Sequence, residues 1–285
     1  MADGLVEFDV RANLDNLQKD MDSAQDTAKK GGNKLADIAG KSAKAIGAAA
    51  VGVGTAAVAA GGYAVNLAND VDKAMNSFLS STGYAADETG HFQNVLEKIY
   101  ANNYGEDFQD IADGMATVTQ NLGEMSDEQL QSITESAFAL RDTFEYDISE
   151  STRAAKAMMD NFGVSGDEAM SMIAAGAQNG LDYSGELIDS ISEYSTQFAK
   201  VGLDADDMFK IFEKGAESGA WNLDKVGDAV KEFSIRAIDG SDSTAAGFTA
   251  IGLNADEMAA KFGQGGETAK KAFSDTLKAL SSIED

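Results

Sequence analysis

Residues 163–168 read GVSGDE, and closely related strings occur at other places in the chain. They are GYAADE at 83–88, GLDADD at 202–207 and GLNADE at 252–257, with a looser copy, GEMSDEQ, at 123–129. The leading glycines are separated by 40, 40, 39 and 50 residues, and a turn-rich insert, DGSDS at 239–243, lies in the longest interval. A repeat of this length is typical of stacked helical hairpins.

Each string contains the residue types that end one helix and begin the next. Glycine just past a helix adopts the left-handed conformation without steric cost, and a following Ser, Asp or Asn accepts hydrogen bonds from free backbone N–H groups. We therefore expect helices to end at the five glycines, which are Gly83, Gly123, Gly163, Gly202 and Gly252. We expect the next helices to begin at four cap residues, which are Ser126, Ser165, Asp204 and Asn254.

The repeats predict an all-α fold, with helical hairpins repeating about every 40 residues. In each unit a second apolar stripe follows, such as the one that begins at Leu187 and the one that begins at Leu223. We expect three regions: residues 1–32, a short strand and an amphipathic helix; residues 33–80, an Ala/Gly-rich hydrophobic helical segment; and residues 81–285, the helical-repeat core.

The composition excludes several classes of function. The 285 residues include no cysteine and a single histidine, which rules out a disulfide scaffold, a thiol nucleophile and a site built from several His or Cys ligands. Forty-eight acidic residues against 22 basic ones give a net charge of −26, which repels nucleic-acid phosphates. We expect no specific nucleic-acid binding. The chain also lacks proline, which suits long helices.

Residues 1–44 differ from the rest, since they carry a net charge of −1 and residues 45–285 carry −25. Alternating apolar residues from Val6 to Ala12 predict a short strand. Leu14, Leu17 and Met21 then begin an apolar helical face that ends before residues 31–32, which are both glycine. This region is either a local strand–helix unit or an oligomerisation element, because an isolated strand has no partner in the chain.

Residues 45–69 contain no charged side chain and are long enough to cross a bilayer as a helix. Small residues recur every four positions, a spacing that lets helices pack closely: Ala48, Gly52, Ala56, Ala60 and Ala64. Alanine and glycine contribute little hydrophobicity. Three interpretations stay open: a buried helix in a bundle, a helix that inserts conditionally into a membrane, and a permanent membrane anchor.

The sequence contains only weak candidates for catalytic or metal-binding patterns. His91 lies one helical turn from Glu88, and no nucleophile is nearby in sequence. This pattern favours a solvated histidine over a catalytic one. Asp204–Asp207 and Asp239–Asp242 lack the spacing of an EF-hand calcium loop, and the glycines at 47–54 are not followed by the GK[ST] ending of a phosphate loop. Much of the acidity fits helix capping, as in Ser165 with Glu168. We expect no catalytic residue, cofactor or metal, and therefore no enzyme.

The order of these features resembles that of phage tail tape measure proteins. The resemblance rests on the strand-like start, the amphipathic helix, the Gly/Ala-rich stretch and the string AVNLANDVDKAM at 64–75. AMMDNFGV at 157–164 and FAKVGL at 198–203 resemble the core units of that family. The resemblance covers nearly the whole chain and is most specific over residues 64–262.

The resemblance implies a structural role. Such proteins lie in the lumen of a growing phage tail, template its assembly and length, and leave with the DNA at infection. Implied partners are further copies of the chain, the tail tube protein, tail assembly chaperones, distal tail or tip proteins and the host membrane. The implied locations are the virion and, during assembly, the host cytoplasm. The chain stops in mid-pattern at 281–285, so we expect an N-terminal part of a longer protein.

Two other classes of function fit parts of the sequence. One is a soluble helical-repeat module that binds a protein partner on a concave surface. The other is an effector that is soluble until residues 45–69 insert into a membrane.

Overall fold

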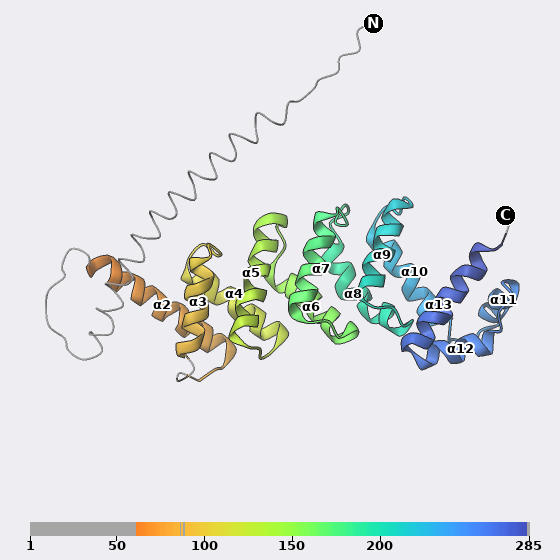
Figure 1. The fold of residues 1–285 in the computed structure, drawn as a ribbon, viewed down its shortest axis with the longest axis horizontal. Helices are drawn as coiled ribbons and strands as arrows, with labels where there is room; N and C mark the ends of the chain where they lie inside the picture. Colours follow the sequence, from red (N-terminus) through yellow and green to blue (C-terminus); the bar gives the residue numbers. More distant parts are fainter. Residues whose placement is uncertain (1–60, 86, 88, 284–285) are drawn as a thin grey trace, which may run out of the picture. The chain divides into compact units, whose positions relative to one another are not determined.

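The computed structural model describes residues 61–283 except residues 86 and 88 (Figure 1). The regular elements in this part are α-helices, which confirms the all-α prediction there. The strand and amphipathic helix expected within 1–32, and most of the hydrophobic segment 33–80, lie outside the described residues. No helix in the described part is both long enough and apolar enough to cross a membrane.

Twelve helices make up the described part. In chain order they are α2 (Gly61–Thr82), α3 (Thr89–Ala101), α4 (Phe108–Leu122), α5 (Asp127–Phe144), α6 (Ile148–Phe162), α7 (Gly166–Gln178), α8 (Leu187–Lys200), α9 (Ala205–Glu217), α10 (Leu223–Arg236), α11 (Asp242–Ala250), α12 (Ala255–Gln264) and α13 (Gly266–Ser281).

Helices α3 to α10 form successive antiparallel pairs that lie side by side in chain order (Figure 1). The second helices of the pairs, α4, α6, α8 and α10, pack against one another in one row. The first helices, α3, α5 and α7, pack in a second row. One continuous hydrophobic core therefore runs between the two rows, as expected of stacked hairpins.

Small side chains let α6 approach its neighbours closely. Ala154, Ala155 and Met158 are buried without measurable exposure. The buried hydroxyls of Ser151 and Thr152 donate to backbone carbonyls one turn earlier in the same helix, at 2.8 and 2.7 Å. These internal hydrogen bonds satisfy the polar groups, so α6 can be buried between α4 and α8.

The second half of α2 belongs to the same core. Ala74, Met75 and Phe78 are fully buried. The ring of Phe78 lies 4.7 Å from that of Phe92 on α3, which in turn lies 4.7 Å from Tyr84 in the connecting loop. This aromatic group joins α2 to the first hairpin.

The final unit departs from the pattern. The turn-rich insert contains the start of a short extra helix, α11, which is capped by Ser241. Helix α13 then packs against α12 and returns to contact α8. At this return Gly202 lies directly against the first turn of α13, with φ of +81°. A Cβ atom at Gly202 would overlap the carbonyl oxygen of Gly266 and lie 2.5 Å from the backbone nitrogen of Lys270.

We predict that Gly202→Ala destabilises the protein more than Gly163→Ala. Both glycines have positive φ, but a Cβ atom at Gly163 would meet nothing within 4 Å. Gly163→Ala therefore costs only the backbone strain, about 1 kcal/mol. Gly202→Ala also forces two backbone segments apart, which brings the cost to about 3 kcal/mol. Urea denaturation followed by circular dichroism at 222 nm measures both, and equal losses would contradict the close approach.

Candidate functional site

The five repeat glycines all have positive φ and follow α2, α4, α6, α8 and α11. Ser126, Ser165, Asp204 and Asn254 are the N-cap residues of α5, α7, α9 and α12, and each side chain accepts a hydrogen bond from a backbone N–H three residues later. Reciprocal capping boxes are present at the first three. At Asn254 the cap is one-sided, because the side chain of Glu257 pairs with Lys261 instead.

Most of the small-residue stripe lies outside the residues that the structure describes. Ala48, Gly52, Ala56 and Ala60 fall before the first described residue, and Ala64 lies in α2 at a position whose side chain is not described. Its role in helix packing or in a membrane therefore stays a prediction.

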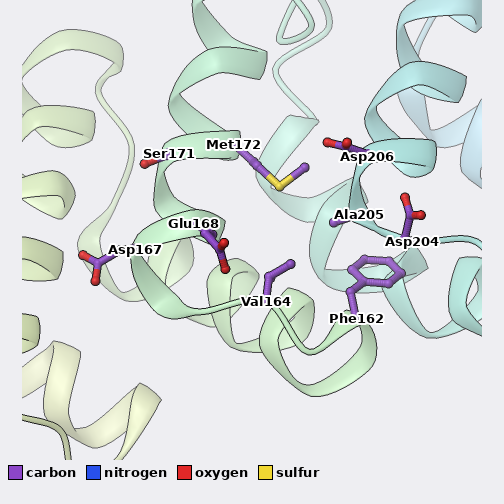
Figure 2. A pocket seen from close by; sticks show the side chains of 9 residues that line it. All are labelled: Phe162, Val164, Asp167, Glu168, Ser171, Met172, Asp204, Ala205 and Asp206. Carbon is purple, nitrogen blue, oxygen red and sulfur yellow. The ribbon is translucent and has the colours of Figure 1, made fainter.

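A groove of about 540 Å³ lies between the N-termini of α7 and α9, beside the C-terminus of α6 (Figure 2). Phe162, Val164 and Met172 point into it and are each half-buried. The carboxylates of Glu168 and Asp206 lie at its rim and are exposed. The groove thus has an apolar floor and an acidic edge. Such a groove is suited to binding another apolar surface.

Other lining residues are directed elsewhere. Figure 2 shows Asp167 and Ser171 on the side of α7 opposite to Met172. Glu168 is engaged in its own helix cap, since it accepts from the backbone N–H of Ser165 at 2.8 Å. This hydrogen bond is the main cause that lowers the pKa of Glu168 below its ordinary value.

The acidic pair Asp204 and Asp207 is held by a lysine. Lys270 Nζ on α13 lies 2.8 Å from Asp204 Oδ2 and 2.5 Å from Asp207 Oδ2. Its hydrogen bond to Asp204 is the main cause that lowers the pKa of that carboxyl group, and the two carboxylates raise the pKa of Lys270. These charges tie α13 to the start of α9. The described residues contain no group of three or more His, Asp or Glu side chains placed to hold a metal ion.

His91 on α3 pairs with a residue of another helix. Its Nδ1 atom lies 2.8 Å from Asp127 Oδ1 in the first turn of α5. The sequence pattern instead pointed to Glu88, which is outside the described residues. The contact joins α3 to α5, and Asp127 is not a nucleophile paired with the imidazole for catalysis but the first residue of a helix.

A buried contact between α8 and α10 had no signal in the sequence. The fully buried phenol of Tyr194 donates a shared hydrogen bond to Asp224 Oδ1 at 2.6 Å and to Asp228 Oδ1 at 3.1 Å. Burial, with the two carboxylates adding to it, raises the pKa of the phenol far above its ordinary value. Gly227 makes room for the ring, because a Cβ atom there would overlap it.

The chain is similar to a known protein family. Residues 98–285, about two thirds of the chain, match the family described as phage-related minor tail protein. The match begins within α3 and includes the groove, the Lys270 contact and the Tyr194 contact. No curated protein and no solved structure matches the chain.

We predict that Tyr194→Phe lowers stability at pH 7 by about 1–2 kcal/mol, because two carboxylates lose a hydrogen bond. Above pH 10, the free energies of unfolding of the Tyr194→Phe variant and of the unchanged protein become more similar. The phenol ionises near pH 10 in the unfolded chain and at higher pH in the folded one, so its stabilisation is complete below pH 10 and is lost as pH rises further.

Urea denaturation at pH 7 and pH 11 measures this difference. Tyr100→Phe is the control, since Tyr100 is 44% exposed on α3, and its stability should equal that of the unchanged protein at both pH values. A Tyr194→Phe difference that stays constant between the two pH values contradicts the assignment.

Proposed function

Because the chain belongs to the phage-related minor tail protein family, we propose that it is a tape measure protein, which lies in the tail lumen and templates tail assembly and length. As a phage tail component, it is part of the virion. In this proposal the protein is present in the host cytoplasm during assembly and leaves with the DNA at infection. Its role is structural, not enzymatic.

The family match over residues 98–285 carries the proposal. A second support is the string at 64–75, which resembles the tape measure family and lies in α2. Since α2 packs into the same core as the first hairpin, the two supports lie on one continuous structure.

The repeat architecture supports a relation between chain length and tail length. Each hairpin of about 40 residues is one unit that packs on its neighbours, so units are added or removed without a new fold. A chain of such units changes length in equal steps, as a protein that sets a length requires.

The proposed partners are further copies of the chain, the tail tube protein, assembly chaperones and distal tail or tip proteins. Contact with the host membrane at infection also belongs to the proposal and rests on the uncharged stretch 45–69. Only the last nine of these residues lie in the described part, within α2.

We predict that deleting residues 124–163 from the phage gene shortens the tail. This deletion removes α5 and α6 and joins Gly123 to Val164, so a glycine still precedes the cap Ser165. The loss of 40 residues shortens the tail by up to about 60 Å, the length of that many residues in a fully extended helix. Electron microscopy of negatively stained particles measures the tail.

A duplication of residues 124–163 is the matched change and should lengthen the tail by the same amount. It also keeps the test informative when the deletion prevents assembly. Tyr100→Phe, which alters no length, should leave the tail unchanged. If phage with the deletion and phage with the duplication both have tails of unaltered length, the tape measure role is refuted.

A further inference from the structure

The single tryptophan of the chain lies open to solvent in the loop between α9 and α10. Trp221 is 74% exposed, the largest fraction among the exposed large apolar side chains of the described residues. Tyr104 and Tyr146 lie in the corresponding loops of the first two hairpins, and both are half-buried. An aromatic residue in such a loop can therefore pack against the array. An indole that is left exposed instead marks a contact for another molecule.

The backbone around Trp221 is held by the neighbouring loop, which joins α7 to α8. Figure 1 shows the two loops at the same edge of the array. The hydroxyl of Tyr183 donates to the carbonyl of Ala220 at 2.9 Å, and the side-chain amide of Asn222 donates to Glu186 Oε1 at 3.2 Å. The residues on both sides of Trp221 are thus fixed. A contact residue on a fixed backbone loses less conformational entropy when it binds a partner.

The same two loops carry negative charge. Residues 179–186 and 218–222 contain Asp182 and Glu186 and neither Lys nor Arg. Tyr183, between these two acidic residues in sequence, is 45% exposed. The exposed aromatic surface therefore lies beside carboxylates.

The charge of Glu186 is not neutralised by its hydrogen-bond partners in the described part of the chain. These are the hydroxyl of Ser184 and the amide of Asn222, each at 3.2 Å. Burial, and after it the charge of Glu186, raises the pKa of the Tyr183 phenol. The carboxylate and the ring are thus close to each other. We call Trp221, Tyr183 and Glu186 the Trp221 patch.

An aromatic face next to a carboxylate is suited to a guanidinium group. The guanidinium of arginine is planar and weakly hydrated, so it stacks on an indole and donates hydrogen bonds to a carboxylate at the same time. The ammonium of lysine is a compact, strongly hydrated charge and cannot stack flat. Tryptophan and arginine are also among the residues that contribute most to protein interfaces.

We propose that the Trp221 patch binds an arginine side chain of a partner protein. The guanidinium stacks on the indole of Trp221 and donates to the carboxylate of Glu186. The net charge of −26 on the chain favours the approach of a basic segment. The inference goes beyond the tape measure role, since it is argued from this patch alone.

The test uses the fluorescence of the 285-residue chain, in which Trp221 is the only tryptophan and therefore reports on this patch. Acetylated hexa-arginine amide is added at physiological ionic strength, and quenching of the emission by acrylamide is measured at each concentration. Bound peptide should protect Trp221 from acrylamide. Hexa-lysine should need a concentration about threefold higher for the same protection, because its ammonium groups do not stack.

Two variants with the same loss of charge separate the patch from the general acidity. Glu186→Gln keeps an acceptor for Asn222 and should raise the hexa-arginine concentration at half-protection about fivefold, the upper range for an exposed ion pair. Glu128→Gln is the matched control, because Glu128 is exposed in the first turn of α5, outside the Trp221 patch. It should leave this concentration unchanged.

The proposal is overturned when hexa-arginine gives no protection, when hexa-lysine protects equally well, or when the two variants behave alike. Protection by phosphatidylcholine vesicles and not by hexa-arginine would also overturn it, since the patch would then bind a lipid surface. A tail of unchanged length in the deletion experiment would leave these results unaffected.

Discussion

Each hairpin in the described part buries its apolar side only against the hairpins next to it. Helix α6 shows the constraint most clearly, since it is packed between α4 and α8 and carries small residues where they approach. A single hairpin has no core of its own, so stability comes from the contact between neighbours.

Several of the acidic residues stabilise this architecture. Carboxylates near the start of a helix accept hydrogen bonds from free backbone N–H groups and face the positive end of the helix dipole. Asp147 caps α6 in this way, and Asp239 accepts from the backbone N–H of Ser241 before α11. The hydrogen bond to Ser241 is the main cause that lowers the pKa of Asp239. Helix ends, and cross-helix pairs such as Arg141 with Asp110 at 2.8 Å, therefore account for part of the acidity of the described residues.

Sequence reasoning works best for features that depend on adjacent residues. A helix end is such a feature, because glycine, cap residue and third-position acid lie within a few residues of one another. Contacts between helices are different. Tyr194 meets Asp224 and Asp228 from 30 and 34 residues away, and Lys270 meets Asp204 from 66 residues away. Periodicity identifies the buried face of a helix but not the residue on the neighbouring helix that it meets.

The final unit shows the same limit. Its insert at 239–243 was interpreted as turns, and Ser241 instead caps the nine-residue helix α11. Glycine at 202 was expected to end a helix. Its close approach to Gly266 and Lys270 could not be seen, because it depends on where α13 returns. The groove was missed for a related reason: Phe162 and Met172 are on different helices, and each is an ordinary half-buried residue in its own stripe.

The acidic surface also has a consequence for a protein that lies in a tail lumen, as we propose. The lumen is the path of the DNA, and a surface with excess carboxylates repels phosphates instead of binding them. The protein and the DNA then share one passage without adhering to each other. An excess of carboxylates is thus compatible with free passage of DNA through the lumen that the proposed role assigns to both.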